Sequence, residues 1–173
     1  MEVKKMESLK ELYKIGRGPS SSHTMGPEKA CKYFKKHIPE ADRFEAILYG
    51  SISKTGVGHG TDKVIKVTFE PIPCDVIFNN DEIELPHPNT MDLIAYKDGA
   101  EIKRIRVLSV GGGKIEIIGH KNVDPPKVYE LATFSEISDY CKKNHIKLWQ
   151  YVEEVEGIEI RDYLFKIWNQ MKS

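Results

Sequence analysis

Closely spaced cysteines, long apolar runs and an excess of either charge are all lacking from this sequence. The three cysteines are far apart, and no two of them have C-x-x-C spacing: Cys31, Cys74 and Cys141. An odd, scattered set makes a poor disulfide framework. It also makes a poor metal or iron–sulfur site, because such ligands usually recur at short fixed spacings. We therefore expect free thiols and no metal held by this chain.

The charges balance, with 26 Lys and Arg residues against 26 Asp and Glu residues. Nucleic acids and anionic membranes attract a basic excess, so neither is expected as a partner. No apolar run reaches the length of a membrane span, and residues 1–14 lack the apolar core of a signal peptide. These features predict a cytoplasmic protein. Its 173 residues form one domain, or one domain with an appended helical segment.

Apolar spacing and turn residues predict an α+β fold, with a mixed, largely antiparallel sheet and flanking helices. The predicted helices cover residues 8–13, 27–38, 63–69, 133–146, 148–155 and 158–171. The predicted strands cover residues 44–49, 74–78, 82–85, 92–96, 102–110 and 114–118, those from residue 74 onward forming a meander with antiparallel neighbours. Two prolines at 125 and 126 mark a boundary between a domain core, 1–124, and a C-terminal helical segment, 125–173.

The first of three predicted loops with glycine, hydroxyl and histidine side chains covers residues 18–27 and leads into a helix. Free N–H groups and the positive end of the helix dipole favour an anion there. His23 offers a base, an acid or a ligand. The neighbouring hydroxyls add hydrogen-bond donors: Ser20, Ser21, Ser22 and Thr24. The alternative is a helix-capping loop with a surface histidine.

The other two predicted loops cover residues 55–62 and 87–91. In the second loop, His59 lies between two glycines, which let a backbone approach a ligand closely. Thr61 and Asp62 follow it, and the alternative is a flexible turn. In the third loop, Asn89 offers hydrogen bonds at a turn bracketed by prolines, which also fits a simple connection between strands.

Together, these segments resemble the signatures of bacterial iron–sulfur L-serine dehydratases, in their β domain or subunit. The resemblance rests on five motifs in the same order over residues 8–118: Gly18-Pro-Ser-Ser-Ser-His-Thr-Met-Gly-Pro27, Leu48-Tyr-Gly-Ser51, Thr55-Gly-Val-Gly-His-Gly-Thr-Asp62, His87-Pro-Asn-Thr-Met91 and Ser109-Val-Gly-Gly-Gly113. It also implies a likeness to the allosteric substrate-binding domain of some phosphoglycerate dehydrogenases, a mixed α/β fold that binds small anions.

The resemblance implies the conversion of L-serine to pyruvate and ammonia. A four-iron, four-sulfur cluster is held by the α domain or subunit, which this chain lacks, and the β part packs over that site. His23 and His59 are then the catalytic candidates, one as general base or proton shuttle. The candidates for substrate binding are Ser20, Ser21, Ser22, Thr24, Thr61, Asp62 and Asn89. Asp62 also fits a role in orienting His59 or capping the following helix. A homodimer is compatible with the sequence.

The chain departs from the family pattern at several positions. Val57 stands where the family usually has lysine, Ile52-Ser53 replaces Leu-Ala, and Lys114 replaces an apolar residue. The loss of a lysine near an anion site affects substrate binding. That L-serine is the substrate is therefore an inference from the resemblance. Two functions remain open: a component that completes a dehydratase site, and a regulatory module that binds serine or a small anion without catalysis. Two histidines in loops favour the first function.

Overall fold

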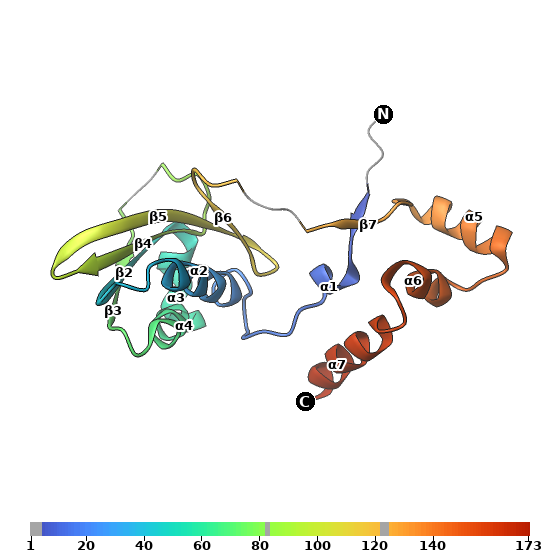
Figure 1. Cartoon of the computed structure of the whole chain (residues 1–173), viewed down its shortest axis with the longest axis horizontal. Coiled ribbons are helices and arrows are strands. Elements are labelled where there is room, and N and C mark those ends of the chain that lie inside the picture. Colours follow the sequence, from blue (N-terminus) through green and yellow to red (C-terminus); the bar gives the residue numbers. More distant parts are fainter. Residues whose placement is uncertain (1–4, 82–83, 122–124) are drawn as a thin grey trace. The chain divides into compact units, whose positions relative to one another are not determined.

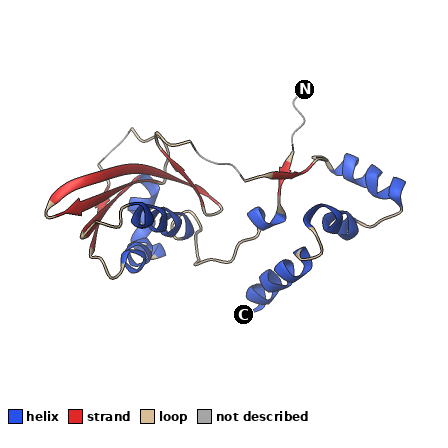
Figure 2. Cartoon of the chain, viewed as in Figure 1, coloured by secondary structure: helices blue, strands red, loops and turns tan. Residues whose placement is uncertain are grey.

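The computed structural model of the chain describes residues 5–81, 84–121 and 125–173. The chain divides into two compact units. One is Gly16–Asn122, here called the sheet unit, and the other combines both ends of the chain, Met1–Ile15 and Val123–Ser173, here called the end unit. Figures 1 and 2 show the elements of each. The division predicted at residues 124 and 125 stays a prediction, and the contacts group the residues before Gly16 with the C-terminal helices.

The sheet unit contains a five-stranded sheet in the order β3-β2-β4-β5-β6, whose strands are labelled in Figure 1. The strands are β2 Arg43–Tyr49, β3 Cys74–Asn79, β4 Thr90–Lys97, β5 Ala100–Gly111 and β6 Lys114–Ile117. β2 and β3 are parallel, while the other three pairs are antiparallel. The predicted α+β class with a mixed sheet and flanking helices is confirmed. The meander is wrong at β3, because two helices carry the chain from β2 to a parallel neighbour.

The helices of the sheet unit are α2 Met25–His37, α3 Gly50–His59 and α4 Thr61–Phe69. The loop predicted over residues 55–62 is therefore wrong, since most of it is the second half of α3 and the start of α4. Glycine has a low helix propensity, but packing outweighs it. At Gly56, a Cβ would lie 3.1 Å from the Phe78 ring and 3.3 Å from the Thr61 hydroxyl. The glycines thus permit a close contact in a helix.

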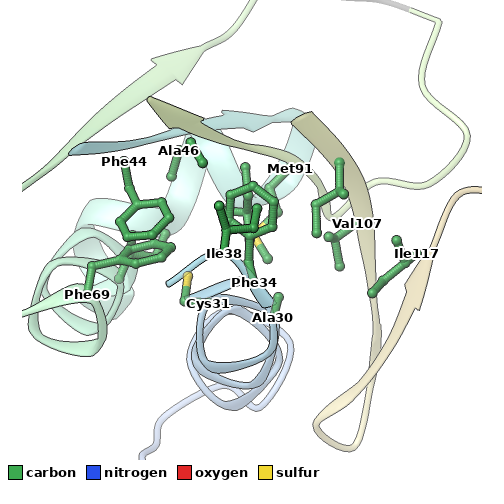
Figure 3. Close-up of a cluster of buried hydrophobic side chains, with 14 of the residues drawn as sticks. Ala30, Cys31, Phe34, Ile38, Phe44, Ala46, Phe69, Met91, Val107 and Ile117 are labelled. Carbon is green, nitrogen blue, oxygen red and sulfur yellow. The ribbon is translucent and has the colours of Figure 1, made fainter. Parts of the chain in front are cut away.

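One face of the sheet packs against these helices and forms the core (Figure 3). Alternate residues of β2 point into it, because successive side chains of a strand point to opposite faces. Phe44 is fully buried and stacks on Phe69 of α4 with ring centroids 4.2 Å apart. Phe34 of α2 meets the Phe44 ring edge-on at 5.8 Å. These contacts fix how α2 and α4 lie on the sheet.

The opposite face of the sheet carries an ion pair that the sequence did not predict. Asp92 is 4% exposed, and its carboxylate accepts hydrogen bonds from Arg106 Nε at 2.7 Å and Arg106 Nη2 at 2.9 Å. The Tyr49 hydroxyl donates to the same carboxylate at 3.0 Å. A buried charge requires such partners. This cluster therefore reads as structural.

The β5–β6 connection is a tight hairpin at the triple glycine. Gly111, Gly112 and Gly113 all have positive φ angles, +100°, +58° and +69°, which side chains disfavour. The pairing of β5 with β6 shifts register between Ser109 and Gly111, next to this turn. A strand predicted over residues 82–85 begins on residues outside the described ones.

The end unit contains a two-stranded pair and four helices: β1 Met6–Glu7 with β7 Lys127–Tyr129, α1 Leu9–Leu12, α5 Phe134–Asn144, α6 Leu148–Glu156 and α7 Ile160–Lys172. The helices predicted here are confirmed, and α5 begins with a capping box formed by Thr133 and Glu136. The β1–β7 pair was not predicted, because two and three residues give too short a pattern. Across the described residues, none of the helices combines the length and the apolar character that crossing a membrane requires.

Candidate functional site

His23 lies in the turn that precedes α2, with its side chain 8% exposed. Its Nδ1 lies 2.9 Å from Ser20 Oγ and 3.0 Å from Ser22 Oγ. Its Nε2 lies 2.9 Å from Thr55 Oγ1 of α3. Both ring nitrogens therefore have hydroxyl partners, and those partners come from two segments about thirty residues apart in sequence.

His59, the last residue of α3, lies beside His23 with the ring centroids 4.6 Å apart. Its Nδ1 donates to the Thr55 carbonyl at 2.9 Å, since a carbonyl oxygen only accepts. Within the described parts of the chain, His59 Nε2 has no hydrogen-bond partner, and the residue is half-buried. The first two predicted segments are thus brought together, with one imidazole enclosed and the other free at one nitrogen.

Two of the predicted substrate-binding residues, Thr61 and Thr24, hold the turn that contains His23 in place. Thr61 and Thr24 are both fully buried. Thr61 Oγ1 donates to the His23 carbonyl at 2.7 Å. Thr24 Oγ1 donates to the Ser20 carbonyl at 2.7 Å and also approaches the Arg17 carbonyl. A hydroxyl has one proton to donate. Since each is donated to the backbone, these threonines fit a role in holding the turn.

Asp62 and Ser21 do not contact either histidine through a hydrogen bond in the described structure. Asp62 is the second residue of α4, and its Oδ1 is buried without a partner. No hydrogen bond links it to His59, so its predicted role in orienting that ring stays a prediction. Nor does its side chain cap α4. Ser21 is half-buried, and its carbonyl accepts from the Gly26 N–H at 2.9 Å in the first turn of α2.

The third segment is tied to the start of α3. Ser51 N–H donates to the Pro88 carbonyl at 2.7 Å. Gly50 has a φ of +58°, and a Cβ there would lie 2.5 Å from the same carbonyl, so glycine is required. Asn89 Nδ2 lies 3.4 Å from the Ser109 carbonyl, while its Oδ1 is buried without a partner. Asn89 therefore keeps an unused acceptor at this end of the sheet.

The environment of His23 favours its neutral form. The pKa of His23 is lowered from 6.5, first by burial and second by the neighbouring His59, while the Ser51 carbonyl opposes the shift. Burial disfavours the charged imidazolium, and two imidazoles in contact resist double protonation. The lowered pKa therefore favours a neutral His23 near neutral pH.

Thr55 was missed as a site residue, although it stands inside a motif quoted from the sequence. Its hydroxyl contacts His23 and its carbonyl contacts His59. The signal was present, because residues four apart in a helix face each other. The loop predicted over residues 55–62 concealed that spacing.

The cysteines of this chain do not form a cluster site. All three are free, and Cys31 is fully buried in the core. Burial raises the pKa of the Cys31 thiol, and it raises that of Cys74 to about 12, whereas a ligand must be a thiolate. Within residues 5–81, 84–121 and 125–173, no three His, Cys, Asp or Glu side chains gather to hold a metal. The residues present do not fit an iron–sulfur cluster.

Comparisons with known proteins agree with the resemblance that the motifs indicated. Residues 8–70 match the family model described as serine dehydratase beta chain. L-serine dehydratase of Streptomyces coelicolor is 28% identical, over 96% of this chain and 48% of that protein. L-serine dehydratase 1 of Escherichia coli K12 is 27% identical over 97% and 48%, and L-serine dehydratase of Haemophilus influenzae is 29% identical over 97% and 48%. The chain spans about half the length of these relatives.

Proposed function

Because the chain carries a serine dehydratase β region, we propose that it is the β component of an iron–sulfur L-serine dehydratase, which converts L-serine to pyruvate and ammonia together with an α part. The observation that carries this proposal is the pair of imidazoles in contact beside the start of α2, one of which has a nitrogen without a hydrogen-bond partner among the described residues. The substrate is inferred from the names of the relatives.

The geometry supports His59 as the general base. Its Nδ1 is protonated by its bond to the Thr55 carbonyl, so Nε2 carries the lone pair. That nitrogen is free to remove the α proton of a substrate amino acid. His23 is enclosed by three hydroxyls, which fits it to relay a proton. General base catalysis by a positioned histidine contributes roughly 10²–10⁴-fold to a rate.

The hydroxyls of the His23 turn are suited to orient the substrate carboxylate. Ser20 and Ser22 lie half-buried at the N-terminal end of α2, where the helix dipole favours a negative charge. Asn89 Oδ1, an acceptor without a partner, is suited to receive the substrate ammonium. Val57 is 67% exposed on α3 and brings no charge, although the family pattern has lysine there.

An α part is needed because this chain's cysteines do not fit a cluster. The relatives are about twice as long as the part of them that this chain matches. We propose that their remaining half corresponds to the α part and supplies the four-iron, four-sulfur cluster, which would activate the substrate hydroxyl as a Lewis acid. The three free cysteines fit the reducing cytoplasm.

The test is anaerobic co-expression of the chain with an α part, followed by a pyruvate assay with L-serine. We expect activity in the assembled complex and a fall of about 100-fold or more in His59→Gln, since the base is lost. His37→Gln is the matched control, because His37 Nδ1 also lies 2.7 Å from the carbonyl four residues earlier in its helix, but at the far end of α2.

Two results would overturn the proposal. If the assembled wild-type complex, with its cluster loaded, forms no pyruvate, the chain is not a component of an L-serine dehydratase. If His59→Gln keeps full activity, the chain is instead a regulatory or structural component that binds serine or another small anion.

A further inference from the structure

We propose that Thr55 is a positioning residue that sets the tautomers of both histidines, through its carbonyl on His59 and its hydroxyl on His23. The tautomer assignment stands on the geometry of this chain. Its consequence for catalysis rests on the proposed function.

The carbonyl of Thr55 fixes His59. The two residues are four apart in α3, so the His59 ring folds back over the last turn of its own helix. A carbonyl oxygen has two lone pairs, and it therefore serves the side chain as well as the helix. Because it only accepts, His59 Nδ1 must carry the proton at the 2.9 Å contact. His59 Nε2 is left as the basic nitrogen.

The hydroxyl of Thr55 fixes His23 in the opposite tautomer. Thr55 Oγ1 has one proton and donates it to the Ser51 carbonyl at 2.8 Å, four residues earlier in α3. At the 2.9 Å contact with His23, this oxygen must therefore accept, so His23 Nε2 carries the proton. His23 Nδ1 is then an acceptor, and the hydroxyls of Ser20 and Ser22 are its two available donors.

One residue thus gives two touching imidazoles opposite tautomers, with lone pairs on different nitrogens. The two effects come from different atoms of Thr55 and are separable. Thr55→Val keeps the β-branched shape and the carbonyl but removes the hydroxyl, so it releases His23 and leaves His59 unchanged. Thr55→Ser keeps the hydroxyl and should restore His23.

The test is long-range ¹H–¹⁵N NMR of the histidine rings in the full ¹⁵N-labelled chain at neutral pH. We expect a protonated Nε2 on His23, a protonated Nδ1 on His59, and a protonated Nδ1 on His37 as internal reference. In Thr55→Val, only the His23 pattern should change, toward a mixture of tautomers, and Thr55→Ser should return it. Thr68→Val is the matched control, because Thr68 Oγ1 also donates to the carbonyl four residues earlier, at 2.7 Å, without contacting a histidine.

A wild-type His23 protonated at Nδ1, or a His23 pattern unchanged in Thr55→Val, would overturn the assignment. In the assembled complex, we expect Thr55→Val to lower kcat by about 10- to 100-fold, as for other residues that orient a reacting group, with KM unchanged and with rescue by Thr55→Ser. Tautomers that shift while kcat stays constant would refute the catalytic part alone. An inactive wild-type complex would refute the proposed function and leave the NMR result standing.

Discussion

Different kinds of interaction stabilise the two units of this chain, each within itself. The sheet unit buries aromatic and aliphatic side chains completely, including Phe44 and Phe69. In the end unit, the buried apolar side chains among the described residues are few: Tyr129, Tyr151, Ile160 and Ile167. Many others there are exposed, such as Phe134 at 82% and Met171 at 71%. Apolar burial, the main source of folding stability, is therefore concentrated in the unit that carries the histidines.

The end unit depends more on one carboxylate. Glu156 of α6 accepts hydrogen bonds from Ser8 Oγ at 2.6 Å, Leu9 N–H at 2.7 Å and Tyr129 hydroxyl at 2.9 Å. Burial alone would raise the pKa of Glu156, but these bonds outweigh it and lower the pKa. The charge connects α1, β7 and α6, which lie at opposite ends of the sequence. The two histidines, whose proposed roles require fixed tautomers, lie in the sheet unit with its closely packed core.

The largest effect is expected at the centre of the sheet core. Phe44→Ala removes a fully buried ring that contacts both Phe34 and Phe69, and should lower the free energy of unfolding by about 3–5 kcal/mol. Urea titration followed by the amide NMR signals of the sheet unit measures it. Val67→Ala is the control, since Val67 on α4 is 51% exposed. A loss under about 1 kcal/mol would contradict the central place of this ring.

Loss of the Glu156 charge should weaken the end unit by about 1–3 kcal/mol, because its three donors lose a charged acceptor. Both tryptophans of the chain, Trp149 and Trp168, belong to this unit, so their fluorescence reports Glu156→Gln directly. Glu154→Gln makes the same charge change on the same helix at an exposed position. If both variants shift the fluorescence-detected unfolding midpoint equally, Glu156 does not have the special role proposed here.

The two units should also respond to acid in different pH ranges. His23 has a pKa lowered from 6.5, so its folded form binds fewer protons than the unfolded chain, and the stability of the sheet unit falls as the pH drops below about 6.5. Glu156 has a pKa lowered from 4.5, so its contribution is present above 4.5 and is lost as the pH falls through its folded value. Stability measured against pH with both probes, in wild type and His23→Gln, tests this. The same profile in His23→Gln would contradict the role of His23.

The smallest effect is expected at the C-terminal end of α7. Met171→Ala should change the unfolding free energy by less than about 0.5 kcal/mol, since Met171 is 71% exposed. One turn earlier, Ile167 is 8% exposed, and Ile167→Ala should cost about 2–5 kcal/mol. Fluorescence-detected urea titration compares the two. A larger loss at Met171 than at Ile167 would contradict the burial of α7 described here, in which Ile167 is enclosed and Met171 is exposed.

Regular apolar spacing made much of the fold predictable. Ala30 and Phe34 of α2 and its C-cap residue Ile38 recur at four-residue spacing, and all three are buried. The parallel pairing of β2 with β3 was not predictable, because the sequence of one strand does not determine which strand it pairs with. The helix α3 was missed because its glycines argue against a helix, and the contacts that favour glycine at Gly50, with Pro88, and at Gly56, with Phe78, are tertiary.

The site was predictable in its residue types but not in its arrangement. His23 and His59 were both named from the sequence, and the structure puts their rings in contact. The buried Thr61 binds the His23 carbonyl, which depends on a tertiary contact across 38 residues, whereas the buried Thr24 binds the carbonyl four residues earlier. Thr55 escaped notice because its role arises only when residues 51, 55 and 59 lie on one helix face.

The most direct test of the proposed base is chemical rescue in the assembled complex. His59→Ala removes a half-buried imidazole with a free Nε2, leaving a space that added imidazole can enter. We expect pyruvate formation to be lost and then to rise with the concentration of neutral imidazole. The enclosed His23, which is 8% exposed, should show no rescue in His23→Ala. Wild-type activity of His59→Ala without imidazole would contradict the assignment of His59 as the base.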